Sequence, residues 1–494
     1  MQLKRLSGWL IVPSFMAASL MAAGPSARLV DAVKNTDKAS ARALLEQHVD
    51  VNVPETDGTT ALHSAARWDD LETAELLIRN GANVKAANRY DVTPLSLACE
   101  NGNAAMIALL LKAGADPNTA LPEGETALMT ASRTGKLEAV KLLIARGADP
   151  NAKEKGHGQT ALMWAAAEGN TAVVEELLEH GADMHARSDG FTPLLFAVRE
   201  GRIGTVRAML KLGADVNETW QGPRRMSGSG SSALVLAVAN AHYELALALL
   251  DAGADPNAAA QGWTALHQIT WVHKPGTGTN DPAPEGSGNV EAFDFVRKLV
   301  AHGANVNARM TKSAKLGPTD LNMIGATPFL MAARTADAPL MRLLAELGAD
   351  PLLPNADNTT PLAVAAGIGT HSPGEDAGTE PEVLEAVKVA LELGGDINAV
   401  DNKGETVMHG AAYKQVPTVA QFLIDKGAKI EVWNRKDKEG VSPLRIAEGA
   451  FVLSKLRAPS PGVAAVLRKA LSDAGLPTEV EPQDLTVLRV REKL

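Results

Sequence analysis

Residues 60–83 read TALHSAARWDDLETAELLIRNGAN, and this stretch decides the fold. Thr60 suits the start of a helix, because its side chain can accept a hydrogen bond from the free backbone amides there. The paired alanines 65–66 allow a neighbouring helix to approach closely, and Leu76-Leu77 gives a second helix an apolar stripe. Gly81 can adopt the left-handed conformation that ends this second helix. The stretch therefore predicts two short helices joined by a turn.

The same pattern recurs along the chain. The first five copies of a Thr-x-Leu motif are separated by 33, 33, 34 and 32 residues, and a Leu-Leu pair followed by a Gly-Ala phrase comes later in each of the first three copies. Pro often follows the Thr, and Pro suits the first position of a helix because it lacks the amide that would be unpaired there. A fixed period of this length indicates a stack of helical repeats that contact only their neighbours. The motif, or a close variant of it, begins at Thr60, Thr93, Thr126, Thr160, Thr192, Ser232, Thr264, Thr327, Thr360, Thr406 and Ser442.

These motifs resemble the ankyrin-repeat family. Residues 60–63 and 264–267 reproduce the family's Thr-Pro-Leu-His phrase apart from the Pro, and Gly-Ala-Asp-Pro-Asn closes the repeats at 114–118 and 147–151. The resemblance covers roughly residues 26–474. It implies an all-α solenoid of about 11–12 helix-turn-helix units with hairpin-like fingers, which binds another macromolecule. It also implies a structural role for His63, His267 and His409, which would bond the neighbouring turn.

The N-terminal residues 1–24 differ from the repeats. Lys4 and Arg5 precede an apolar stretch from Trp9 to Ala23, and small residues follow at 22–24, which is the layout of a secretory signal peptide. We expect export, with the bacterial periplasm as the destination. The extracellular medium, or the inner membrane through an uncleaved anchor at 6–23, is the alternative. After this segment we expect a degenerate N-terminal capping repeat at 25–58, repeats at 59–440, a C-terminal capping repeat at 441–476 and a tail at 477–494.

Four insertions interrupt the period, at 218–231, 271–289, 309–325 and 367–381. Insertions in solenoids become loops and often cluster on one binding face. The alternative is that these loops are merely tolerated, since doubling the length of a loop costs only about 0.6 kcal/mol. All four fall in repeats six to nine, so we expect recognition there and a regular spacer in repeats one to five.

Motifs for known chemistry are missing from the sequence. It contains no Gly-x-Ser-x-Gly elbow, P-loop or His-Glu-x-x-His motif, and its single cysteine, Cys99, falls where the repeat needs a small buried residue. A net charge of −10 argues against general binding to nucleic acid. We therefore expect a non-enzymatic protein without cofactor or metal. A secreted effector that binds host proteins is one alternative, and an enzyme with its site in the insertions of residues 271–325 is another.

The family binds partners with its finger tips and with the two residues that follow Ala-Ala in the first helix. Trp, Tyr and Arg at such positions are the residue types that dominate binding hot spots. We expect a monomer that binds a protein partner and has no contact with a membrane beyond the N-terminal segment. The candidate contact residues, expected at exposed positions, are Arg67, Trp68, Tyr90, Glu100, Arg133, Glu168, Arg199, Trp220, Arg224, Trp263, Trp271, Arg334 and Tyr413. The alternative is that some of the aromatic residues, particularly Trp164 and Trp263, pack between adjacent repeats.

Overall fold

The structure, a computed structural model, describes residues 25–223, 228–275, 284–314, 319–374, 376–449, 451–452 and 455–479. The chain divides into two units. The N-terminal unit runs to Ala197 and also includes Gly204–Ala214, and the C-terminal unit comprises Val198–Ile203 and the chain from Asp215 on. The expected signal peptide at 1–24 and most of the expected tail lie outside the described residues.

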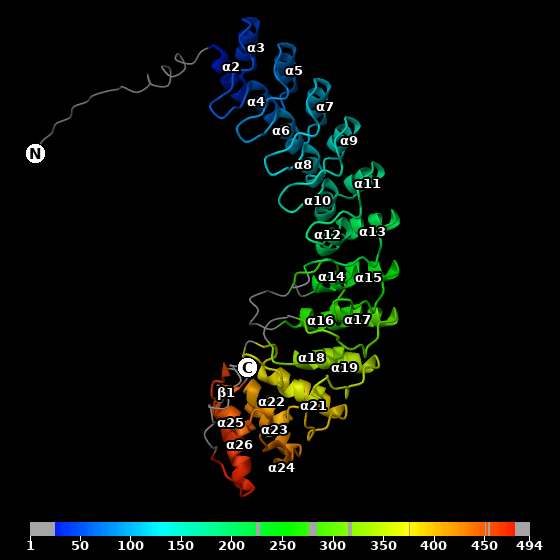
Figure 1. The fold of residues 1–494 in the computed structure, drawn as a ribbon, viewed down its shortest axis with the longest axis vertical. Coiled ribbons are helices and arrows are strands. Elements are labelled where there is room, and N and C mark those ends of the chain that lie inside the picture. The colour runs from blue at the N-terminus through cyan, green and yellow to red at the C-terminus, as the bar shows by residue number, and fades with distance from the viewer. Residues whose placement is uncertain are drawn as a thin grey trace, which may run out of the picture. The chain divides into compact units, whose positions relative to one another are not determined.

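Helix pairs build the N-terminal unit. Helices α4, α6, α8 and α10 lie side by side in a first row, and α5, α7, α9 and α11 form a second row (Figure 1). The finger loops extend from the first row on the side away from the second row (Figure 1). The helices are α2 Pro25–Lys34, α3 Lys38–Glu46, α4 Ala61–Arg67, α5 Leu71–Arg79, α6 Pro94–Asn101, α7 Ala104–Lys112, α8 Ala127–Arg133, α9 Leu137–Ala145, α10 Ala161–Glu168 and α11 Thr171–Glu179, followed by α12 Pro193–Arg199 and α13 Ile203–Lys211, which the division between the units cuts.

The C-terminal unit continues the same alternation. Its first row contains α14, α16, α18, α20, α22 and α25, each in contact with the next, and its last helix, α26, packs on α23 and α25. The elements are α14 Ala233–Ala239, α15 Tyr243–Asp251, α16 Ala265–His273, α17 Ala292–Ala301, α18 Pro328–Arg334, α19 Ala338–Glu346, α20 Pro361–Ala366, α21 Glu380–Glu392, α22 Val407–Lys414, α23 Pro417–Asp425, α24 Ile430–Trp433, α25 Pro443–Ala447, β1 Phe451–Val452, β2 Lys455–Leu456 and α26 Pro461–Asp473. Apart from the two-residue strands β1 and β2, all regular structure in the described part is helical, so the all-α prediction is confirmed.

The Thr-x-Leu-His phrase starts a helix and ties it to the next repeat. The backbone N–H of Thr60 donates to His63 Nδ1 at 3.1 Å, so the ring carries its proton on Nε2, which donates to the carbonyl of Val92 at 3.0 Å. His267 makes the equivalent bond to Ala326 O at 3.1 Å. The structural role expected for these two histidines is confirmed. His409 caps its helix in the same way, but among the described residues no hydrogen bond of standard geometry reaches its buried Nε2.

An asparagine near the start of the finger joins successive repeats. Asn118 Nδ2 donates to the carbonyl of Gly147 at 2.9 Å, and Asn118 Oδ1 accepts the N–H of Asp149 at 2.8 Å. Gly147 is the left-handed residue that follows α9, with φ +88°. The asparagine therefore forms hydrogen bonds with backbone groups just after the end of a helix in the neighbouring repeat. The same pair of bonds recurs at Asn52, Asn151, Asn257 and Asn307.

Small residues fill the core between the helices. Ala65, Ala66, Ala98 and Cys99 are fully buried, and burial raises the pKa of the Cys99 thiol to about 12. Cys99 is thus held as a neutral thiol in the core. Among the residues that the structure describes, no helix is long and apolar enough to cross a membrane, and no group of side chains is arranged to hold a metal ion.

Candidate functional site

The candidate contact residues differ sharply in exposure between the two units. Six of them are exposed, and all six lie in the N-terminal unit, whereas three others are half-buried and three are buried. The exposed residues are Arg67, Trp68, Tyr90, Glu100, Arg133 and Glu168. The half-buried ones are Arg199, Trp220 and Arg334, and the buried ones are Trp263, Trp271 and Tyr413. Arg224 lies outside the described residues.

The expectation that Trp263 and Trp271 are exposed is wrong. Their rings meet edge to face with centroids 6.1 Å apart, and their side chains are 4% and 9% exposed. Trp263 Nε1 donates to Gln268 Oε1 at 2.8 Å, whereas the buried Trp271 Nε1 has no hydrogen-bond partner among the described residues. The two rings therefore pack at the start and the end of the same helix, α16, and leave little surface for a partner.

The expected exposure of Tyr413 is also wrong. Its hydroxyl donates to Asp437 Oδ2 at 3.4 Å, and the guanidinium of Arg457 lies over its ring, 5.4 Å from the centroid. Arg457 itself donates to Asp320 Oδ2 and to the carbonyl of His371, each at 2.6 Å. Arg457, from the C-terminal part of the chain, thus covers the ring, and its guanidinium links residues of two insertions.

Trp220 is half-buried against its own insertion. A side chain on Gly222 would meet the Trp220 ring at 2.2 Å, so the ring lies directly on the backbone of the insertion. The N–H of Trp220 donates to the carbonyl of Ser231 at 2.9 Å, which closes the base of this loop. The loop therefore occupies part of the tryptophan surface that we expected to face a partner.

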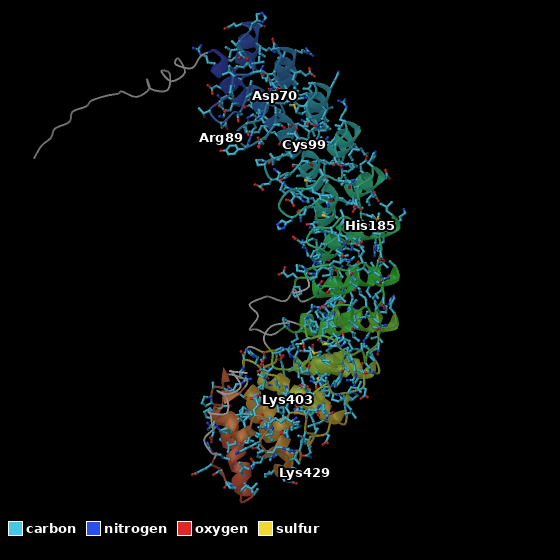
Figure 2. All side chains as sticks on the ribbon, in the orientation of Figure 1. Asp70, Arg89, Cys99, His185, Lys403 and Lys429 are labelled. Carbon is cyan, nitrogen blue, oxygen red and sulfur yellow. The ribbon has the colours of Figure 1, made fainter. Side chains whose placement is uncertain are left out.

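Four of the six exposed residues, Arg67, Tyr90, Glu100 and Arg133, line a groove of about 510 Å³ between the fingers and the first row of helices. We call this the N-terminal groove. Figure 2 shows Arg89, next to Tyr90, on the finger side of this unit. The groove is lined by Asp57, Thr59, His63, Ser64, Arg67, Asn88, Tyr90, Val92, Ser96, Leu97, Glu100, Leu121, Glu125, Thr126, Ala127, Thr130 and Arg133.

Equivalent positions of three successive repeats supply the wall of the groove. Arg67, Glu100 and Arg133 are spaced by 33 residues, and each follows the buried part of its first helix. Ser64, Leu97 and Thr130 form a second row with the same spacing, one turn earlier in the helices. Our sequence analysis named the first row and missed the second, although its period could have revealed it.

Two of the charged residues in the groove are free of partners. The side chains of Arg67 and Glu100 form no ion pair with any described residue, whereas Arg133 pairs with Glu125 at 3.4 Å and lies over the Trp164 ring. At the finger, Arg89 donates to the Tyr90 hydroxyl at 2.7 Å. The groove therefore presents an aromatic ring and unpaired charges of both signs, which are groups that recognise a protein surface.

The C-terminal unit, in contrast, buries several of its ionisable groups. Burial, and next the nearby carboxylate of Asp401, raises the pKa of Glu405 to about 7. Burial likewise raises the pKa of Asp437, although the backbone amides of Val441 and Glu439 oppose this shift. These two carboxyl groups of the first-row side thus lie inside the fold and are not presented to a partner.

One serine lies close to a histidine in the region of the enzyme alternative. Ser287 Oγ is 3.0 Å from His242 Nδ1, and His242 Nε2 lies 3.0 Å from the carbonyl of Arg199. The backbone N–H of Ser287 donates to the same Nδ1 at 3.0 Å, so it competes for the lone pair that a general base would use. This geometry fits a histidine that fastens the end of the insertion.

Comparison with known families agrees with the geometry. A family model described as ankyrin repeats in three copies matches residues 29–120, 90–154 and 128–219, and a model of the single ankyrin repeat matches residues 229–260. The chain is therefore an ankyrin-repeat protein. Its repeats indicate a protein–protein interaction scaffold, and proteins of this family are generally non-enzymatic.

Proposed function

We propose that this protein is an exported scaffold that binds a partner protein in the N-terminal groove. The observation that carries the proposal is the groove itself, about 510 Å³ in volume and lined by equivalent positions of three repeats. Tyr90, on its finger side, is 54% exposed, and Trp68, next to the groove residue Arg67, is 57% exposed. Large exposed aromatic side chains of this kind mark binding surfaces on soluble proteins.

The chemistry of the groove defines the kind of partner. Leu97 and the Tyr90 ring offer apolar contact, while Arg67 and Glu100 offer charges of opposite sign that are unpaired within the described part of the chain. The partner segment should therefore present an apolar side chain with an acidic and a basic residue nearby. Charge pairs of this type contribute chiefly to specificity and to the rate of association.

The test is the affinity of the purified partner for the mature chain and for two variants, Trp68→Ala and Tyr90→Ala. Loss of an aromatic hot spot costs about 2 kcal/mol or more, so we expect each variant to bind at least tenfold more weakly. Leu212→Ala is the matched control, because Leu212 is also exposed, at 42%, but does not line the groove. Equal affinities for all three variants would place the binding surface elsewhere.

Export is the second part of the proposal, and it rests on the signal-like sequence of residues 1–24. The test is the intact mass of the chain recovered from the periplasm, the membrane and the culture medium of the native cells. A product that lacks the N-terminal segment in the periplasm supports the proposal. The same product in the medium supports the effector alternative, and a full-length chain in the membrane supports the anchor.

A further inference from the structure

Two cations line a small, partly open cavity beneath one of the insertions of the C-terminal unit. Arg334 is the last residue of α18, and Lys414 is the last residue of α22. The cavity between them has a volume of about 20 Å³, and the insertion supplies Gly367, Gly369, Thr370 and Asp376 to its wall. None of these residues belongs to the N-terminal groove.

The two cations, of which Lys414 is buried and Arg334 half-buried, have few hydrogen-bond partners. Lys414 is 8% exposed, and its Nζ donates only to the carbonyls of Asp376 and Ala377, at 3.2 and 2.6 Å. The only hydrogen bond of the Arg334 guanidinium to a described residue is a long one, 3.4 Å, from Nε to Thr319 Oγ1. Neither cation forms an ion pair in the described part of the chain. Buried charges are normally paired, because an unpaired one loses its hydration without replacement.

The neighbouring charges leave this pair uncompensated. Lys274, the third cation nearby, is neutralised by Glu382 at 2.9 Å. Among the described residues that line the cavity, Asp376 is the one carboxylate, and its Oδ2 already accepts the N–H groups of His371 and Ser372. Burial lowers the pKa of Lys414 to about 8 although Asp376 acts to raise it. These described residues, two cations and one carboxylate, together carry a net charge of about +1.

Glycines keep the wall of the cavity close and free of side chains. A Cβ on Gly367, whose φ is +123°, would lie 2.4 Å from the carbonyl oxygen of Gly410 in α22. A Cβ on Gly369 would lie 2.5 Å from the Cβ of Leu321, which belongs to another insertion. The loop can therefore approach α22 this closely only with glycine at these positions. In addition, the hydroxyl of the buried Thr370 makes no hydrogen bond to any described residue.

The volume indicates the size of the missing group. One water molecule needs about 10–15 Å³ by the same measure, so the cavity has room for about two oxygen-sized atoms. A carboxylate has two oxygen atoms and one negative charge, and both properties match the cavity. A sulfate or phosphate group is larger and brings a second charge.

We propose that this cavity is a binding site for the carboxylate of a small organic acid, held by Arg334, Lys414 and the Thr370 hydroxyl. The guanidinium and the ammonium donate charge-assisted hydrogen bonds to the two oxygen atoms, and Thr370 donates a third bond. The negative charge of the bound carboxylate balances the excess positive charge of the cavity. The site shares no residue with the N-terminal groove.

Acetate is the probe, and the measurement is its dissociation constant for the full chain from NMR titration of carbon-13-labelled acetate, with chloride holding the ionic strength constant. We expect saturable binding to the unmodified chain and weaker binding of sulfate. Lys414→Gln should weaken acetate binding at least tenfold, because it removes a hydrogen bond to a charged group. Lys429→Gln is the matched control, since Lys429 is exposed on the same unit (Figure 2).

Thr370→Val tests the site with little change of volume, and it serves if Lys414→Gln does not fold. We expect it to weaken acetate binding severalfold while circular dichroism stays unchanged. The proposal is overturned if acetate shows no saturable binding to the unmodified chain, if sulfate binds as tightly as acetate, or if every folded cavity variant binds acetate like the Lys429→Gln control.

Discussion

The position that follows the paired alanines of the first helix has opposite surroundings in the two units. In the N-terminal unit it holds Arg67 and Arg133, which are exposed beside the groove. In the C-terminal unit it holds Arg334, which lies against two inserted segments, and Tyr413, whose ring is covered by Arg457. Equivalent positions of a repeat thus become either a binding surface or part of the core, depending on whether another segment lies over them.

The covering segments carry their own polar network. Arg457, which is 5% exposed, joins Asp320 in one insertion to His371 in another. His371 Nδ1 also lies 2.9 Å from Asp320 Oδ1. The insertions of the C-terminal unit are therefore structural parts of it as well as candidate sites. Substitutions in these insertions should lower stability, whereas substitutions in the N-terminal groove should weaken binding.

The largest contrast is expected between two tyrosines. Tyr413→Ala removes a ring that is 5% exposed, and we expect the free energy of unfolding of the C-terminal unit to fall by about 4 kcal/mol. Tyr90→Ala removes an exposed ring and should leave the unfolding transitions unchanged. Urea denaturation followed by circular dichroism measures both. Equal losses of stability would contradict the difference that we draw between the two units.

A smaller effect is expected from the buried arginine. Arg457→Met leaves the Asp320 carboxylate without its ion pair, and breaking such a buried pair costs about 3 kcal/mol. Arg79→Met is the control in the N-terminal unit, because the pair of Arg79 with Glu75 is exposed and should contribute nothing measurable. The melting temperatures of the two variants provide the comparison. A melting temperature of Arg457→Met equal to that of the unmodified chain would show that Arg457 does not hold the insertions.

The next effect depends on pH. The folded pKa of Glu405, about 7, is above the usual glutamate value of 4.5, so the folded state binds the proton more tightly than the unfolded state does. Its contribution to stability is therefore complete below about pH 4.5 and is lost as the pH rises through 7. We compare the free energy of unfolding of Glu405→Gln with that of the unmodified chain at each pH. We expect this difference to shift in favour of the variant by about 2 kcal/mol between pH 5 and pH 8.

The measurement is urea denaturation of both chains at the two pH values, with Glu179→Gln as an exposed control. Asp437 has a raised pKa as well, so some pH dependence should persist in the variant. A stability difference that is the same at pH 5 and pH 8 would show that Glu405 does not titrate in this range.

The smallest effect concerns Cys99, the only cysteine in the sequence. Because its thiol is buried and its pKa is about 12, we expect the native chain to react with a thiol reagent at pH 8 only when the N-terminal unit opens. Arg67→Ala and Glu100→Ala change exposed groove residues, so the rate of labelling should stay within about twofold. Rapid labelling of the unmodified chain would mean that the core around α6 is open.

The repeats were predictable from the sequence because their determinants are local. Thr60 and His63 lie within one helical turn, and the 33-residue period brings Arg67, Glu100 and Arg133 onto one face. The region of recognition was predicted less well. We placed it in repeats six to nine because of their insertions and aromatic residues, but Trp263, Trp271 and Tyr413 proved to be buried.

These errors have a common physical cause. The guanidinium over Tyr413 comes from Arg457, 44 residues later in the chain, and the carboxylate that fixes this arginine comes from Asp320, 93 residues earlier than Tyr413. A periodic pattern shows which face of a helix a residue occupies, but it contains no information on what an irregular segment will cover. The partner bonds of Asn118 and its equivalents were missed for a similar reason, since they link groups about 30 residues apart.

By itself the sequence determined the repeat, the starts and ends of its helices and the alanine-rich core, because these depend on side-chain size and hydrogen bonds over a few residues. Only the tertiary structure decided which repeated positions remain exposed, and where Arg334 and Lys414 meet around a cavity. Those outcomes depend on contacts between segments far apart in the chain, and such contacts form only when the repeats have stacked and the insertions have folded back over them.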